Sequence, residues 1–206
     1  MRSVEFSAPS VPDARVQPLL AGVERIGVLS ATDVQPMAAL DIERVLARLG
    51  HAVREQVAAR PALTVIAPEE IVWRLGSVQL DSAEVVAPAS RQALVDSLGL
   101  DAIIVVELRR LEARTTPISP GPYGMTTDPG LDLAVELRMS LVNLHGKGVW
   151  QQSGQEREWR ASPLQLGGSQ GEQQLLGALS RPLQRFLRQV APPPSTQVRD
   201  FDLSGR

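Results

Sequence analysis

The most hydrophobic strand pattern in the chain, Ala102 to Val106, follows a helix-ending glycine at Gly99 and a turn residue at Asp101. Gly99 suits the left-handed conformation that often ends a helix. Polar alternation begins at Glu107. This order predicts a central strand that is covered where it starts and reaches solvent where it ends.

Before this strand, short apolar runs alternate with helical patterns. In residues 37–59 the apolar positions recur every three or four residues, which predicts an amphipathic helix. Pro68 suits the first turn of a short helix that ends near Gly76. The pattern therefore predicts strands at 24–30 and 62–67, helices at 37–59, 68–76 and 90–98, and irregular chain at 77–88.

After the central strand, residues 131–144 alternate strictly between apolar and polar positions, as a half-buried strand does. The residues HGKG at 145–148 predict a hairpin turn, and 149–160 return as a more polar strand. A capping-box spacing that starts at Ser169 precedes the last helix, which we expect Pro182 to kink or divide.

The order of these elements predicts an α/β fold. Strands joined by helices favour parallel crossovers in the N-terminal half, and strands joined by loops favour an antiparallel meander in the C-terminal half. We expect a single three-layer domain with a mixed sheet and helices on its faces. It would span residues 22–190, between a flexible leader at 1–21 and a Pro-rich tail at 191–206.

Composition narrows the function classes. The chain is 43% hydrophobic and 21% charged with a net charge of −2, which argues against broad nucleic-acid binding. It contains no cysteine, so disulfides, thiolate nucleophiles and cysteine metal sites are excluded. The first residues lack the basic start and apolar run of an export signal. We expect either a cytoplasmic protein or a mature envelope protein with a new start.

Candidate chemistry is sparse. Residues 167–171, GGSQG, match the G-x-S-x-G pattern, but the motif needs a later histidine and the last one is His145. His51 and His145 have no second metal ligand at a suitable spacing. Asp96 and Asp101 are explained by capping and turn roles. We therefore expect no enzyme activity, no cofactor and no metal site.

Two features point to recognition instead. Trp150 and Trp159 are nine positions apart on one predicted strand, so they are expected on opposite faces. One of them could pack under a helix while the other contacts a partner, and packing of both is the alternative. The Pro- and Gly-rich loop at 115–130 offers three further partner-binding candidates, Ile118, Tyr123 and Met125. The alternative is that this loop is a connection without a binding role.

The segments ALVDSLGLDAIIVVELRRLEA (93–113) and SLVNLHGKGVWQQSGQ (140–155) carry a family resemblance. They resemble the helix, leu-gly-x-asp, strand segment and the strand-turn-strand of bacterial envelope lipoproteins. This group includes the curli secretion channel, the activator of penicillin-binding proteins (LpoB-like) and the Pel polysaccharide export lipoprotein (PelC-like). Asn143 stands where an aspartate is usual in the group.

Membership in this group would imply a non-enzymatic periplasmic α/β domain held at the outer membrane by an N-terminal lipid that this chain does not contain. Its partners would be envelope proteins or further copies of itself. Residues 115–130 are too rich in proline and glycine for the membrane hairpin of a curli-type pore.

Three hypotheses follow for the function. The first is a periplasmic accessory protein in envelope assembly, secretion, polysaccharide export or peptidoglycan synthesis. The second is a cytoplasmic or periplasmic small-molecule enzyme, which a concave pocket with titratable groups of shifted pKa would favour. The third is an auxiliary lipoprotein of a lipid-transport system, which an apolar groove would favour.

Overall fold

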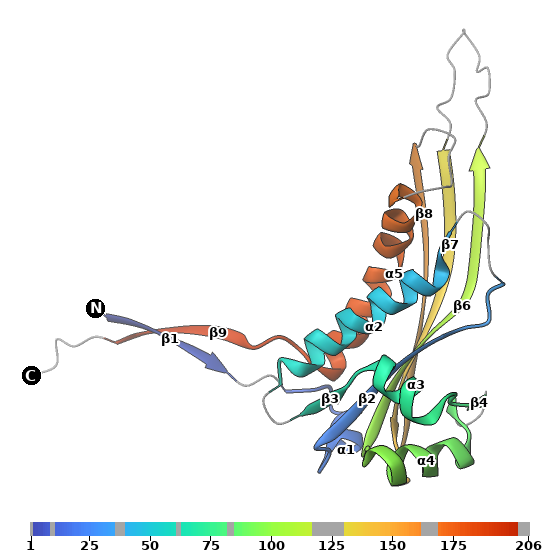
Figure 1. Ribbon diagram of the computed structural model, residues 1–206. Coiled ribbons are helices and arrows are strands. Elements are labelled where there is room, and N and C mark those ends of the chain that lie inside the picture. Colours follow the sequence, from blue (N-terminus) through green and yellow to red (C-terminus); the bar gives the residue numbers. More distant parts are fainter. Residues whose placement is uncertain are drawn as a thin grey trace, which may run out of the picture.

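The computed structural model describes residues 2–8, 11–35, 40–60, 63–81, 85–116, 130–161 and 169–201. For residues 2–8, 115–116, 130–131, 159–161, 169–170 and 195–201 it describes the backbone. Figure 1 shows an upright sheet with helices on both faces and a two-stranded arm that projects from its base.

A five-stranded mixed sheet organises the domain in the order β3-β2-β6-β7-β8. Its strands are β2 (Arg25–Thr32), β3 (Thr64–Ile66), β6 (Ala102–Thr116), β7 (Gly130–Asn143) and β8 (Gly148–Ala161). β2 pairs in parallel with β3 and β6, whereas β6, β7 and β8 form an antiparallel meander. The predicted α/β class and mixed sheet are confirmed, with the most hydrophobic strand, β6, at the centre.

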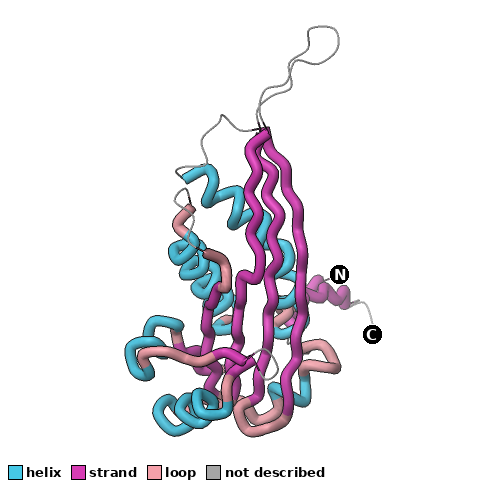
Figure 2. Tube along the Cα trace, turned by 90° about the vertical axis from the view of Figure 1, so that its right-hand side faces the viewer, coloured by secondary structure: helices cyan, strands magenta, loops and turns pink. Residues whose placement is uncertain are grey.

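The helices form the outer layers. α2 (Ile42–Ala58) and α5 (Ser169–Val190) cover one face of the sheet along its length. α3 (Pro68–Leu75) and α4 (Pro88–Leu98) cover only the lower part of the other face. As Figure 2 shows, the three meander strands rise well above these two helices. Among the described residues, no helix covers the upper part of that face.

The apolar patterns explain this layering. The alternate β7 residues Leu133, Val135, Leu137, Met139 and Leu141 are buried against α2 and α5. Ile103 and Val105 of β6 are buried with α3 and α4 in a second, smaller cluster. Pro182 lies inside α5, which stays one continuous helix rather than two. Among the described residues, no helix has both the length and the apolar content that crossing a bilayer requires.

A β-bulge in β6 changes which residues face the open part of the sheet. The ladder with β7 pairs Leu108 with Leu137 and Arg110 with Glu136, so Arg109 is an extra residue. Beyond the bulge, Leu111 and Ala113 pack against the core, whereas Arg110, Glu112 and Arg114 share the open face. The sequence alternation did not predict this shift.

Asp101 ties three strand ends together at the base of the sheet. Its Oδ2 accepts the backbone N–H groups of Glu24 and Arg25, each at 2.9 Å. Its Oδ1 lies 3.1 Å from the Nε2 atom of His145. The predicted turn residue therefore also fixes the start of β2 and the β7–β8 turn.

Short elements complete the chain. The segment predicted as irregular contains the hairpin β4 (Leu80–Asp81) and β5 (Val85–Val86). Helix α1 (Gln17–Leu20) buries Leu19, and Val16 before it is fully buried, so part of the predicted leader packs on the core. β1 (Arg2–Ala8) pairs with β9 (Ser195–Phe201) in an antiparallel ladder that joins the two ends of the described chain.

Candidate functional site

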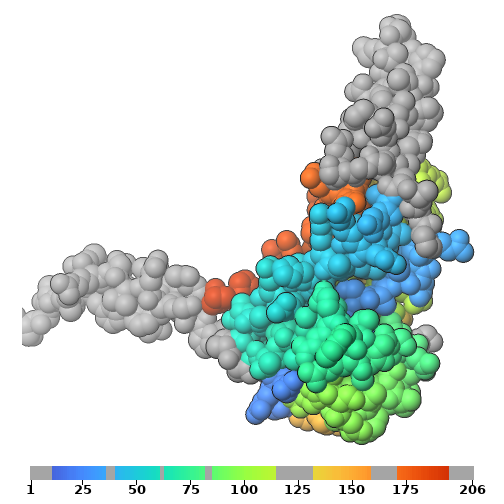
Figure 3. All heavy atoms as spheres, viewed as in Figure 1, coloured from blue at the N-terminus to red at the C-terminus, as the bar shows by residue number. Residues whose placement is uncertain are grey.

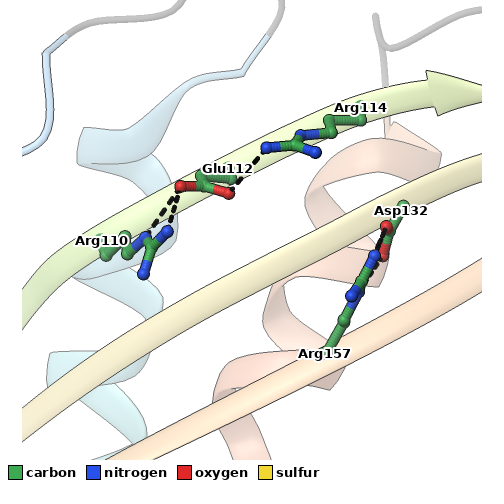
Figure 4. A network of polar contacts seen from close by, with 5 residues as sticks. All are labelled: Arg110, Glu112, Arg114, Asp132 and Arg157. Atoms are coloured by element: carbon green, nitrogen blue, oxygen red, sulfur yellow. Dashed lines mark hydrogen bonds and ion pairs between the residues drawn. The ribbon is translucent and has the colours of Figure 1, made fainter.

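The open face of the meander carries a charged platform. We define it as seven residues: Arg110, Glu112, Arg114, Asp132, Glu136, Gln155 and Arg157. They come from the upper halves of β6, β7 and β8 and line a shallow hollow of about 370 Å³. Because α3 and α4 stop below this level, no described helix covers the platform (Figures 2 and 4).

Ion pairs within the platform neutralise its charges. Arg110 and Arg114 both contact Glu112 on the same strand, as Figure 4 shows. Across the strands, the Nε atom of Arg157 donates to the Oδ1 atom of Asp132 at 3.0 Å. Three guanidinium groups thus face three carboxylates, those of Glu112, Asp132 and Glu136. The platform is therefore charge-balanced.

The pairing also fixes the protonation states. Hydrogen bonds from Arg110 and Arg157 hold the pKa values of Glu112 and Asp132, respectively, below their usual range. The same bonds raise the pKa values of Arg110 and Arg157. A general acid or base works best with a pKa near the operating pH. These shifts move the pKa values of the carboxylates and guanidinium groups further from pH 7, so the platform is poorly suited to acid–base catalysis.

At the foot of the platform lies a more deeply buried pair. Arg138 donates two hydrogen bonds to the carboxylate of Glu107, from Nε at 2.5 Å and from Nη2 at 2.7 Å. The Glu107 side chain is 4% exposed. The hydrogen bonds to Glu107 raise the pKa of Arg138. A bidentate pair of this kind orients both strands. We assign it a structural role at the boundary between covered and open sheet.

The free edge of the sheet is the second candidate. β8 is an edge strand of 14 residues, and its ladder with β7 runs without a register shift. Natural edge strands are commonly protected by lysine, proline, a bulge or short length. β8 has no lysine, no proline and no bulge, whereas the opposite edge, β3, has only three residues. Of the two edges of the five-stranded sheet in the described residues, that of β8 therefore offers the longer template for a further strand.

The two tryptophans of β8 occupy different environments. Trp150 stacks on Phe186 of α5 with ring centroids 5.1 Å apart, so it packs under a helix. Trp159 pairs in register with Asp132 in the upper half of β8, and its side chain is not among those described. Ile118, Tyr123 and Met125 lie outside the described residues. The partner-binding role of these five residues stays a prediction.

A third tryptophan is exposed to an unusual degree. Trp73 on α3 has 81% of its surface exposed, beside Val72 at 50%. The pattern of residues 68–76 predicted a helix there and gave no signal for this exposure. A single exposed aromatic residue does not form a continuous apolar surface.

The histidines have local partners. His51 lies 3.2 Å from Glu55 one turn along α2, and His145 contacts Asp101. Within the part of the chain that the structure describes, no three potential metal ligands come together. Gly167 and Gly168 of the GGSQG motif lie outside the described residues.

Asn143, the departure from the family pattern, has a specific role in this chain. Its Oδ1 accepts the backbone N–H groups of His145 and Lys147, at 3.0 and 3.3 Å. Its Nδ2 donates to the carbonyl of Leu19 at 2.9 Å. An aspartate could cap the turn but could not donate to Leu19, so the amide adds an anchor for α1.

Comparisons with known proteins find similar solved structures. No protein-family model and no curated protein sequence matches the chain. Among solved structures, lipoprotein GNA1162 from Neisseria meningitidis is similar at 16% identity and a TM-score of 0.43. The match covers 78% of this chain and 98% of that chain.

Two further structures belong to groups that the sequence resembles. A PelC dodecamer from Paraburkholderia phytofirmans matches at 13% identity and a TM-score of 0.40, over 89% of this chain and 96% of that chain. The LpoB C-terminal domain from Salmonella enterica matches at 15% identity and a TM-score of 0.35, over 68% and 93%.

Proposed function

We propose that the protein is a non-enzymatic periplasmic accessory protein of the cell envelope that acts by strand addition at the β8 edge. Its partners are copies of itself and components of envelope assembly, secretion or polysaccharide export. The observation that carries this proposal is the long, regular and unprotected β8 edge. Strand addition to an exposed edge is a common mode of protein recognition, because backbone hydrogen bonds supply the affinity.

The charges of β8 support the same interpretation. Glu156 forms ion pairs with Arg181 and Arg185 of α5. Arg157 is held by Asp132 of β7. Charged side chains are one way in which edge strands are protected, but these two are balanced by partners within the protomer, which weakens their interaction with an incoming strand. Of the two tryptophans, the proposal uses Trp159, because Trp150 packs on Phe186.

The two other functions have less support. An acid–base catalytic site would need a group with a pKa near the working pH. In the platform, the pKa values of Glu112 and Asp132 are lowered by their arginine partners. A lipid-transport role would need an apolar groove. The second described hollow, about 400 Å³ between the C-terminal ends of α2 and α5, is lined by polar groups and prolines, including Arg60 and Arg188.

In-cell photo-crosslinking with membrane fractionation tests this proposal. A photoreactive residue is placed at Gln155, which is exposed on β8, and a matched control at Arg54, which is exposed on α2. We expect the protein in the outer-membrane fraction, with crosslinks from position 155 to a second copy or to an envelope protein. Recovery as a soluble cytoplasmic monomer without such crosslinks would overturn the proposal.

A further inference from the structure

The two-stranded arm, β1 with β9, is separate from the main sheet. β1 and β9 pair with each other over seven residues each, and neither pairs with a described strand of the main sheet. In Figure 1 the arm projects sideways from the base of the domain. An isolated two-stranded ribbon is at best marginally stable in water, and it becomes stable when further strands or a packing surface are added.

The free part of β8 matches the arm in length. At its lower end, β8 lies beside α1, where Leu19 approaches Gly148. The upper part, Gly154 to Ala161, keeps its register with β7 throughout and has no second described neighbour strand. This segment has eight residues, against seven in each arm strand. One arm strand is therefore short enough to pair along this part of the β8 edge.

The chemistry of the two segments is also compatible. Each arm strand carries one basic and one acidic residue, Arg2 with Glu5 in β1 and Arg199 with Asp200 in β9. Neither strand contains proline or lysine. The β8 segment carries charges that are already paired within the protomer, as for Arg157 with Asp132. No net charge on either side opposes their approach.

From these observations we infer that the β1–β9 arm of one copy adds to the upper β8 edge of a second copy. The contact joins two different surfaces, so its repetition produces a ring where the rotation closes and a filament where it does not, and a reciprocal exchange gives a dimer. It extends the five-stranded sheet of one protomer by the two strands of another. This inference rests on the proposed function, because it names the strand that occupies the β8 edge.

Cysteine pairing tests the contact directly, since residues 1–206 contain no cysteine. Protein of residues 1–206 with Gln155→Cys is mixed with protein carrying Ser7→Cys in β1 or, separately, Thr196→Cys in β9, and disulfide formation is followed under mild oxidation. Protein with Arg54→Cys replaces the β8 variant as the matched control. We expect one arm position to form the mixed disulfide with position 155 at least tenfold faster than with position 54.

A second variant separates the arm from the rest of the interface. Val198→Pro lies in the middle of β9 opposite Glu5 and removes a backbone donor from the arm. We expect it to shift the assembly toward monomer in sedimentation while leaving the circular dichroism of the domain unchanged.

The outcomes distinguish the arm contact from the role of the β8 edge as a binding surface. Assemblies that form with no preferred disulfide from either arm strand and survive Val198→Pro would overturn the arm contact and leave the β8 edge as the binding surface. A protein that stays monomeric and gives no in-cell crosslinks from position 155 would overturn both.

Discussion

Pro182 of α5 lies directly on Gly154 of β8: a Cβ atom placed on Gly154 would be 2.4 Å from the Cβ of Pro182. The proline ring thus occupies the space that any larger residue in β8 would need. This close approach places the middle of α5 against the edge strand and sets the distance between β8 and the helix layer. In Figure 3 the atoms of α5 lie behind those of α2. Glycine is required here by packing rather than by its φ angle.

The first prediction concerns this contact. Gly154→Ala forces α5 away from β8 and is expected to lower the free energy of unfolding by about 1–3 kcal/mol, the usual cost of overpacking. Ser153→Ala, at the neighbouring exposed position, is the matched control and should change it by less than about 0.5 kcal/mol. Urea unfolding of both variants checks this, and equal stabilities would show that α5 can move without cost.

The second prediction separates the described tryptophans. Trp150→Ala removes the ring that stacks on Phe186 and is expected to cost about 2–5 kcal/mol. Trp73→Ala removes a side chain that is 81% exposed and should cost less than about 0.5 kcal/mol. Thermal or urea unfolding measures both. A large loss of stability for Trp73→Ala would mean that the residue is covered in the folded protein in solution.

The third prediction follows from the amide of Asn143. Asn143→Asp keeps the acceptor for the turn but replaces the donor to Leu19 with a carboxylate oxygen beside a carbonyl. We expect a loss of about 1–3 kcal/mol, the cost of leaving a buried acceptor unpaired. Hydrogen exchange should be faster in α1 than in the wild-type protein. Unchanged exchange in α1 would show that Leu19 is held by packing alone.

The fourth prediction is a pH dependence at Asp101. Burial raises the pKa of this carboxyl, but hydrogen bonds from the backbone of Arg25 and Glu24 and from His145 outweigh it and lower the pKa overall. Because the pKa is lower in the folded state, the ionised group stabilises the protein fully above the unfolded-state pKa. This contribution is lost as the pH falls through the folded-state pKa.

Asp101→Asn keeps an acceptor and loses the charge, so we expect it to be less stable than wild type by about 1 kcal/mol at pH 7. The difference should stay constant down to about pH 5 and shrink toward zero below it. Unfolding of both proteins as a function of pH measures this. A difference that grows on acidification would contradict the assigned direction.

Local patterns were sufficient to predict most of the fold. The alternation in residues 131–144 and the helical spacing in 37–59 follow from burial on one face, and the structure has β7 and α2 at these places. The bulge at Arg109 was not predicted, although two consecutive polar residues, Arg109 and Arg110, break the alternation between Leu108 and Leu111. A doublet of this kind can also be the end of a strand, so the local pattern alone does not show that the strand continues with its faces exchanged. Long-range pairing was also beyond local patterns, as for β1 with β9.

The candidate site was predicted less completely than the fold. The sequence singled out the strand that carries Trp150 and Trp159, and this strand, β8, lies at the edge of the sheet. The charged platform was missed, because Glu112 and Asp132 come together only through the register of β6 with β7. Which strand is at the edge depends on the order of all five strands, and no local signal carries that information.

Hydrogen exchange of the β8 backbone amides over a concentration series tests the central claim most directly. Amides of residues 154–161 that bond to β7 are expected to be protected at every concentration. Those that point outward should exchange freely in dilute protein and become at least tenfold slower as the protein assembles. If the outward amides exchange at the same rate in the monomer and in the assembled protein, the β8 edge is not the surface through which copies of this protein assemble, which contradicts the account.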